Sequence, residues 1–200
     1  MSLSAGLKDK MKQLTSARFT IKQNIDICVR DATGKIKKVF NPNKLYIWLM
    51  KKNLASPFLR IPLLFGNWAD HLNISNLTTT TGKAGIASRI NGDGAEAAFT
   101  YIAVGTGVTA ADVADTTLQT ETAVSGLSRA AATASRVTTD TTNDTAQLAK
   151  TFSVTGTVAV TESGVLNAAS VGVLLARQVF SAINVVNGDS LTITWKFDVD

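Results

Sequence analysis

The sequence has very little of the residues that most enzymes and metalloproteins use for chemistry. It contains one cysteine, Cys28, and one histidine, His71. A single cysteine excludes an intramolecular disulfide framework and a Cys-cluster zinc site, and a single histidine leaves little scope for His-based metal binding. The only glutamates are far apart in the chain: Glu96, Glu121 and Glu162. A paired acid and base site would therefore depend on the fold alone to bring carboxylates together.

Long apolar runs are also missing. The most apolar stretch, from Leu54 to Phe65, is interrupted by Pro57, Arg60 and Pro62 and is too short to span a bilayer. At the N-terminus, lysines are interleaved with leucines and no apolar h-region follows, so no signal peptide is expected. We therefore expect a protein that is made in a cytoplasm and used without secretion through a membrane.

Charge is distributed unevenly along the chain, whose net charge is +5. Residues 1–60 hold thirteen lysines and arginines against three aspartates, a net of +10, whereas residues 61–200 have a net of −5. Such a basic segment predicts an acidic partner, either a protein surface or, through sequence-blind attraction, nucleic acid. The alternative is a solvated helix face followed by a lysine-rich hairpin. No helix-turn-helix or RNA-binding signature appears in the sequence.

The first residues have the pattern of an amphipathic helix, predicted for residues 3–17. Its apolar stripe has spacings of four, four and three residues and consists of Leu3, Leu7, Met11 and Leu14. An isolated helix of this length is marginal in water, so the stripe must dock against its own domain or a neighbouring subunit. The stripe lacks the Trp and Phe anchors that are usual in helices lying on membranes.

A β-hairpin is predicted within residues 19–40. Alternating apolar residues lead into the turn Asp31–Gly34, where the glycine supplies permissive backbone and the aspartate a local hydrogen bond. Three lysines follow on the second strand: Lys35, Lys37 and Lys38. They would discourage uncontrolled edge pairing, or they would contact an acidic partner.

A short helix and an apolar segment follow the hairpin. The sequence Asn41–Asn43, with a proline at its centre, is a stop signal, and a helix is predicted after it, from Leu45 to Asn53. The aromatic and apolar segment that comes next is interrupted by proline, which disfavours both a helix and a central strand. It is interpreted as core or, in an assembling protein, as interface. Its interface candidates are Phe58, Leu63, Phe65 and Trp68.

The remainder of the chain is predicted to be a connector followed by β-structure. Residues 73–98 are polar and rich in glycine, and they are interpreted as the connector. From Phe99 onward the chain is interpreted as successive antiparallel strands. Turns between them are predicted at Asn143–Asp144, Gly156, Ser163–Gly164 and Asn187–Asp189. In the last predicted strand, Leu191 to Val199, apolar and polar residues alternate strictly.

Three local patterns invite a chemical interpretation. Gly105–Gly107 lacks the third glycine of a dinucleotide site and the lysine of a P-loop, so a tight turn after a strand is predicted. Asp112 and Asp115 could share a calcium ion, but further oxygen ligands at regular spacing are missing. His71 has no nucleophile-elbow serine to accompany it, and we expect it to be packed or hydrogen-bonded. The sequence predicts no catalytic residue, no cofactor and no metal site.

Five segments between residues 82 and 200 share a recognisable order. They are Ala103–Gly107 (AVGTG), Asp112–Asp115, Leu118–Glu121 (LQTE), Glu162–Ala168 and Leu174–Arg177. In this order they resemble a β-rich domain of minor structural proteins of tailed bacteriophages. The resemblance implies a virion protein, and it leaves the place in the virion open, because such domains occur in tails, fibres and head-decorating proteins.

The sequence therefore predicts a mainly β fold, an antiparallel, jelly-roll-like β-sandwich with a short N-terminal helix and hairpin. The predicted division is a basic anchoring region (1–60), a connector with part of the core (61–98) and the sandwich (99–200). The predicted function is that of a structural virion protein, not an enzyme, which assembles with its own copies and other virion proteins into a tail, neck or baseplate ring.

Two alternatives to the ring remain open. One is capsid decoration, in which the chain binds the outside of a phage head. The other is a module that binds a host glycan or receptor, which would need exposed aromatic residues on loops of the sandwich. The aromatic residues of the predicted strands fit a core better, since they follow the apolar alternation: Tyr101, Phe152, Phe180, Trp195 and Phe197.

Overall fold

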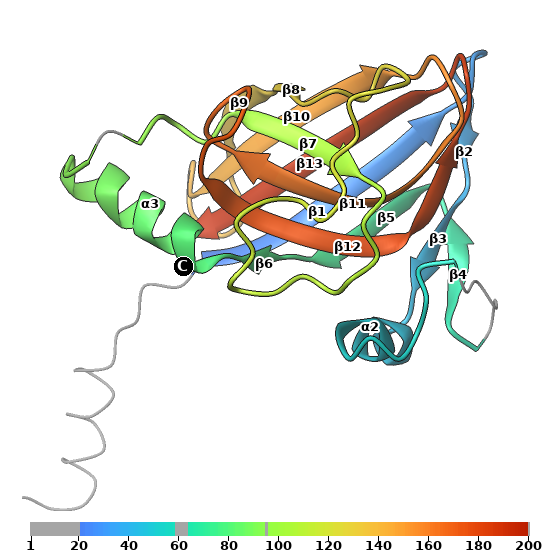
Figure 1. The fold of residues 1–200 in the computed structure, drawn as a ribbon, viewed down its shortest axis with the longest axis horizontal. Coiled ribbons are helices and arrows are strands. Elements are labelled where there is room, and N and C mark those ends of the chain that lie inside the picture. Colours follow the sequence, from blue (N-terminus) through green and yellow to red (C-terminus); the bar gives the residue numbers. More distant parts are fainter. Residues whose placement is uncertain (1–20, 59–63, 95, 200) are drawn as a thin grey trace, which may run out of the picture.

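The computed structural model describes residues 21–58, 64–94 and 96–199. These residues form a mainly β protein, as predicted, and every strand pair in it is antiparallel. Two sheets face one another in a sandwich-like arrangement, and two helices lie at its opposite ends (Figure 1). Neither of these helices is long and apolar enough to cross a membrane.

The larger sheet is organised around the C-terminal strand. Its order is β2-β1-β13-β10-β9, and β5 also pairs with β1. The strands are β1 (Ile21–Arg30), β2 (Ile36–Lys37), β5 (His71–Ser75), β9 (Thr133–Val137), β10 (Thr145–Ser153) and β13 (Ser190–Val199). Because β1 pairs with β13 along its whole length, from Ile21 opposite Val199 to Arg30 opposite Ser190, the two ends of the described chain are locked together.

The smaller sheet has the order β6-β12-β11-β7-β8. Its strands are β6 (Leu77–Thr78), β7 (Tyr101–Gly105), β8 (Ala130–Ala131), β11 (Val158–Leu166) and β12 (Leu174–Val185). A separate ribbon of two strands, β3 (Val39–Pro42) and β4 (Gly66–Ala69), stands beside the sandwich with helix α2 (Lys44–Lys51) between its strands in sequence. Helix α3 (Thr80–Asn91) lies at the other end (Figure 1).

One apolar core fills the space between the two large sheets. It takes Ile27 and Trp195 from the larger sheet and Val165 and Phe180 from the smaller one. Trp195 has no exposed surface, and its indole Nε1 donates a hydrogen bond to Ser163 Oγ over 3.2 Å. The alternation predicted for the last strand is confirmed from Leu191 to Phe197, where every apolar residue is buried, whereas at the end of β13 Asp198 is buried and Val199 is exposed.

The predicted hairpin and the helix predicted after Asn43 are also confirmed. Asp31 Oδ1 accepts hydrogen bonds from the backbone N–H groups of Thr33 and Lys35, and Gly34 has the positive φ of 85° that the turn requires. Helix α2 begins after Asn43, whose side-chain oxygen accepts a hydrogen bond from Tyr46 N over 2.9 Å. However, β1 is a central strand of the larger sheet, not part of a separate anchoring region.

The interpretation of residues 73–98 as a connector is wrong. This segment contributes most of β5, all of β6 and the twelve residues of α3. Glycine lowers helix propensity, which hid α3 in the sequence. In the fold, Gly82 and Gly85 face the sandwich, where a Cβ at Gly82 would collide with the backbone of Leu175. The glycines therefore allow a close approach of helix and sheet.

The turn predicted at Ser163–Gly164 is also wrong, because both residues lie inside β11. Gly164 faces the side chains of Leu118 and Leu174 at a distance that leaves no room for a Cβ. Here glycine marks close packing, not chain reversal. The predicted turns at Asn143–Asp144, Gly156 and Asn187–Asp189 do lie between strands.

Candidate functional site

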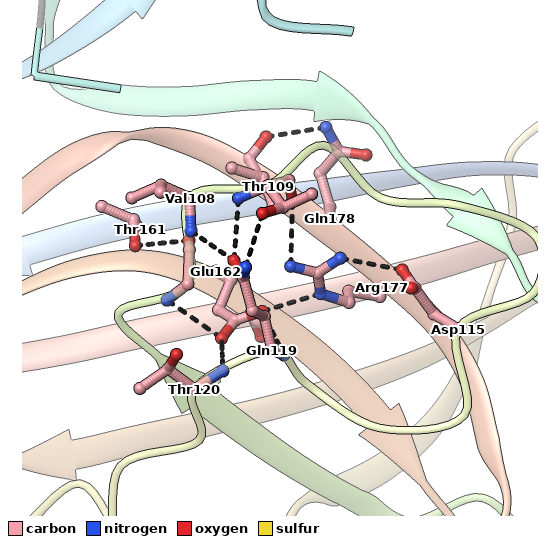
Figure 2. A network of polar contacts seen from close by, with 12 residues as sticks. Val108, Thr109, Asp115, Gln119, Thr120, Thr161, Glu162, Arg177 and Gln178 are labelled. Atoms are coloured by element: carbon pink, nitrogen blue, oxygen red, sulfur yellow. Dashed lines mark hydrogen bonds and ion pairs between the residues drawn. The ribbon is translucent and has the colours of Figure 1, made fainter. Parts of the chain in front are cut away.

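The first candidate is a network of buried charges beneath the loop that follows β7 (Figure 2). Glu162 of β11 and Arg177 of β12 lie on neighbouring strands, and Arg177 Nε donates to Glu162 Oε2 over 2.7 Å. Their side chains are 0% and 2% exposed. A buried charge pair of this kind is stable only when its remaining polar atoms are also satisfied.

Both oxygens of Glu162 are fully engaged. Oε1 accepts the backbone N–H groups of Gly107 at 3.0 Å and Thr120 at 2.6 Å, and Oε2 accepts that of Gln119 at 3.0 Å besides the arginine. These donors lie at the two ends of the loop formed by residues 106–120, so the carboxylate holds the two ends of this loop together. Four protein donors therefore surround the two oxygens of Glu162, which makes this a structural site.

The other end of Arg177 fixes the middle of the same loop. Its Nη1 donates to Asp115 Oδ2 over 2.8 Å, and its Nη2 donates to the carbonyl of Thr109 over 3.0 Å. Asp115, one of the two carboxylates that the calcium hypothesis would use, thus forms an ion pair with Arg177. Among the described residues, no group of three or more His, Cys, Asp or Glu side chains is arranged to hold a metal ion.

This network explains the Gly-Thr-Gly pattern. Strand β7 ends at Gly105, as predicted, and a Cβ at either Gly105 or Gly107 would collide with the Glu162 carboxylate. The sequence carried a signal for the site that we did not use: Glu162 and Arg177 are lone charges inside apolar segments that form strands. Charged residues in such positions are almost always paired.

His71 is a hydrogen-bonded residue of the sheet surface, as predicted. Its Nδ1 lies 3.0 Å from Asp26 Oδ2 on the adjacent strand β1. Both side chains are partly exposed, at 49% and 31%.

The second candidate is the part of the chain from β3 to β4, residues 39–58 and 64–69, which we call the projection. It lies at one end of the sandwich (Figure 1) and has a small core of Phe40, Tyr46 and Met50 that packs on Val179 of β12. All exposed Leu, Phe and Trp side chains of the described residues belong to it: Leu45, Trp48, Leu54, Phe58, Leu64 and Trp68. The other exposed large apolar residues are valines and one isoleucine.

Helix α2 shows why these side chains are exposed. It has six consecutive apolar residues, Leu45 to Met50, but it packs on the sandwich along one side only. Tyr46 and Met50 face inward, so Leu45 and Trp48, which are three residues apart, face solvent. A helix that is apolar all round needs cover on more than one side. Large exposed apolar groups of this kind usually mark an interaction surface.

The structure places only some of the predicted interface residues here. Phe58 is exposed, Trp68 is about half exposed and in edge contact with Phe40, and Phe65 is partly buried against Tyr46. The remaining apolar candidates lie outside the described residues and stay predictions: Leu3, Leu7, Met11, Leu14 and Leu63.

The hairpin lysines are used partly within the chain. Lys37 Nζ lies 2.5 Å from Asp189 Oδ2, and Lys38 Nζ lies 2.7 Å from Asp70 Oδ1, where its hydrogen bond lowers the pKa of that carboxyl. Lys35 is exposed. Lysines that already have a carboxylate partner contribute less to an external acidic surface than the sequence alone suggests.

A cavity of ≈ 200 Å³ lies between the projection and the sandwich. Its walls include Ile47 and Met50 of α2, Ile74 of β5 and Phe180 of β12. Such a mostly apolar hollow beside exposed apolar side chains can accept a side chain from a partner protein.

The structure thus offers a rigid structural network and an exposed apolar projection, and the projection is the surface suited to interaction. Comparisons with known proteins do not identify a family: no protein-family model, no curated protein and no solved structure matches this chain.

Proposed function

We propose that this chain is a structural protein of a tailed-bacteriophage virion, which assembles through the projection into a homo-oligomeric tail, neck or baseplate ring. The observation that supports assembly is the concentration of exposed Leu, Phe and Trp side chains on the projection. The phage context rests on the resemblance of the segments between residues 82 and 200. The occupant of the surface is a second copy of this chain.

The free energies of burial and association favour a closed ring over an isolated dimer. Fully burying a large apolar side chain contributes about 1.5–3 kcal/mol, so covering six that are half exposed adds about 5–9 kcal/mol. Association costs roughly 4–15 kcal/mol in lost freedom. One such contact is therefore weak, whereas a ring gives each subunit two contacts and closes without exposed ends.

The uneven distribution of charge favours contact between two different surfaces of neighbouring copies. Residues 32–69 contain no Asp or Glu but include exposed lysines around α2, Lys44, Lys51 and Lys52. Residues 61–200 have a net charge of −5. A basic projection that meets an acidic surface of the next copy gives a heterologous contact, which generates rings.

Light scattering on the purified chain tests this proposal. The double variant Leu45→Gln/Trp48→Gln keeps good helix formers in α2 and leaves its buried side intact. We expect a ring-sized particle for the unmodified chain and a monomer for the variant. The matched control is Val124→Gln, which alters an exposed apolar residue outside the projection and should not change the mass.

Two other functions would be indicated by different experimental results. If the unmodified chain is monomeric and binds only to a preformed phage head, capsid decoration replaces the ring. The exposed aromatic residues Phe58, Trp48 and Trp68 also suit stacking on sugar rings, which favours a host glycan module as the second candidate. Quenching or enhancement of tryptophan fluorescence by a glycan, lost in Trp48→Gln, would support that function instead.

A further inference from the structure

A second apolar surface lies at the opposite end of the sandwich, beside α3. It is a groove of ≈ 500 Å³ between the start of β1, strand β6 and one side of α3, and its walls include Ile21, Leu77, Ile86, Ala87 and Ile90. Ile90 is 72% exposed, the largest exposed fraction among the described leucines and isoleucines.

The groove exists because α3 contacts the sandwich through glycine. Gly82 and Gly85 are buried against Leu175 and the ring of Phe99. The helix therefore sits close to the sheet, and its larger residues point along the side and away. Ile86 packs partly against the core, and Ile90 is left mostly exposed.

A polar atom in the groove wall also lacks a partner. Gln23 donates its amide Nε2 to Thr78 Oγ1, but its Oε1 is buried and has no hydrogen-bond partner among the described residues. An unpaired buried acceptor costs about 1–3 kcal/mol. A donor brought by a segment docked in the groove would remove that cost.

The first described residue of the chain lies at this groove. Ile21, the first described residue, forms part of its wall, and the start of β1 lies next to α3 in Figure 1. The twenty residues before it contain the stripe Leu3, Leu7, Met11 and Leu14, which needs an apolar surface to form a stable helix. We propose that the groove is the docking site of the chain's own N-terminal segment, with this stripe against Ile86 and Ile90.

The dimensions fit this occupant. A helical stripe from residue 3 to residue 14 is about 16 Å long, and the twelve residues of α3 span about 18 Å. The six residues 15–20 reach at most about 20 Å, enough to turn the segment back onto α3. A short tether gives an effective concentration of the order of millimolar, which favours the chain's own segment over that of a neighbour. The inference does not depend on the proposed virion role.

Cysteine pairs in the full chain test the docking. Ile90→Cys is combined in turn with Leu7→Cys, Met11→Cys or Leu14→Cys. In the N-terminal control, Ile90→Cys is paired with Lys12→Cys, which a helix would place on the opposite face from the stripe. In the α3 control, the stripe cysteines are paired with Ala84→Cys, an exposed position outside the groove, instead of Ile90→Cys. The native Cys28 is buried, and burial raises the pKa of its thiol, so it competes little.

Under mild oxidation, at least one stripe pair should form an intramolecular disulfide about tenfold faster than the Lys12→Cys and Ala84→Cys controls. Peptide mass mapping then identifies the bond within a monomer. The proposal is overturned if no stripe pair reacts faster than the controls, or if the fast product joins two chains, which would assign the groove to a neighbouring copy. Because Ile90 is mostly exposed, its substitution should leave the fold intact.

Discussion

The sandwich and the projection differ in how far they bury tryptophan. Trp195, in the sandwich, has no exposed surface and a hydrogen-bonded indole, whereas Trp48 and Trp68, in the projection, are 53% and 46% exposed. The burial of Trp195 is complete within one chain. The projection has the composition of a core but only one side covered, so its remaining apolar surface is available to a second chain.

The largest effect is expected from a matched pair of substitutions, Trp195→Ala and Trp48→Ala, which tests this difference. Removing the buried indole should lower the free energy of unfolding by about 3–5 kcal/mol, because it leaves a cavity in the core. Removing the exposed indole should change it by no more than about 0.5 kcal/mol. Urea denaturation of dilute protein measures both. Similar losses for the two variants would mean that Trp48 is part of the core.

A second test concerns the polar part of the sandwich. Glu162→Gln keeps the shape of the side chain but replaces one acceptor oxygen with a donor among four donors, and we expect a loss of about 2–3 kcal/mol. Hydrogen exchange should accelerate in residues 106–120, which the carboxylate holds. The control Glu121→Gln, in a partly exposed pair with Arg129, should cost about 0–1 kcal/mol. Unchanged exchange in the loop would refute the structural role.

A third test weakens the projection alone. Asn43→Ala removes the cap of α2 and the hydrogen bond from Asn43 Nδ2 to the carbonyl of Leu64, at a cost of about 1 kcal/mol. Exchange of the α2 amides should rise while that of β13 stays the same, and oligomers should dissociate at a higher concentration. Lys44→Ala is the control, since it changes the next residue without a cap. Equal effects in α2 and β13 would show that the two regions unfold as one.

The smallest expected effect is a pH dependence confined to the sandwich. Hydrogen bonds from the backbone N–H groups of Thr141, Thr139 and Asp140 hold the pKa of Asp144 well below its ordinary 3.8. A lowered pKa stabilises the fold above the ordinary value, and this stabilisation is lost as the pH falls below about 3.8 toward the lower folded value. The Thr141 amide should therefore lose protection in acid, and less so in Asp144→Asn. Within residues 32–58 and 64–69 of the described chain there is no carboxylate side chain, so α2 should not respond.

How far the sequence predicts this fold depends on the range of the interactions. The alternation of β13 from Leu191 to Phe197, the Asp31–Gly34 turn and the helix that follows Asn43 are local patterns, and all three are predicted correctly. Helix α3 was missed because its glycines are explained only by Leu175 and Phe99, which are distant in the sequence. The same holds for Glu162 and Arg177, whose pairing depends on strand register.

The exposed surface of the projection is indicated by the sequence only in part. Phe58 and Trp68 are among the predicted interface candidates, whereas Leu45 and Trp48 are treated only as helix residues. A run of six apolar residues in α2 exceeds what one buried face can accept, and this excess was the available signal. Which face a helix buries depends on the position of the sandwich relative to it, which no local pattern contains.

The projection should become buried when copies of this chain associate. The chain has three tryptophans, of which Trp48 and Trp68 are exposed and Trp195 is buried, so acrylamide quenching of their fluorescence reports on the projection. Quenching should be measured together with mass by light scattering over a range of concentrations. We expect quenching to fall as the mass rises. A rise in mass with unchanged quenching would show that copies associate through another surface and that the projection stays exposed.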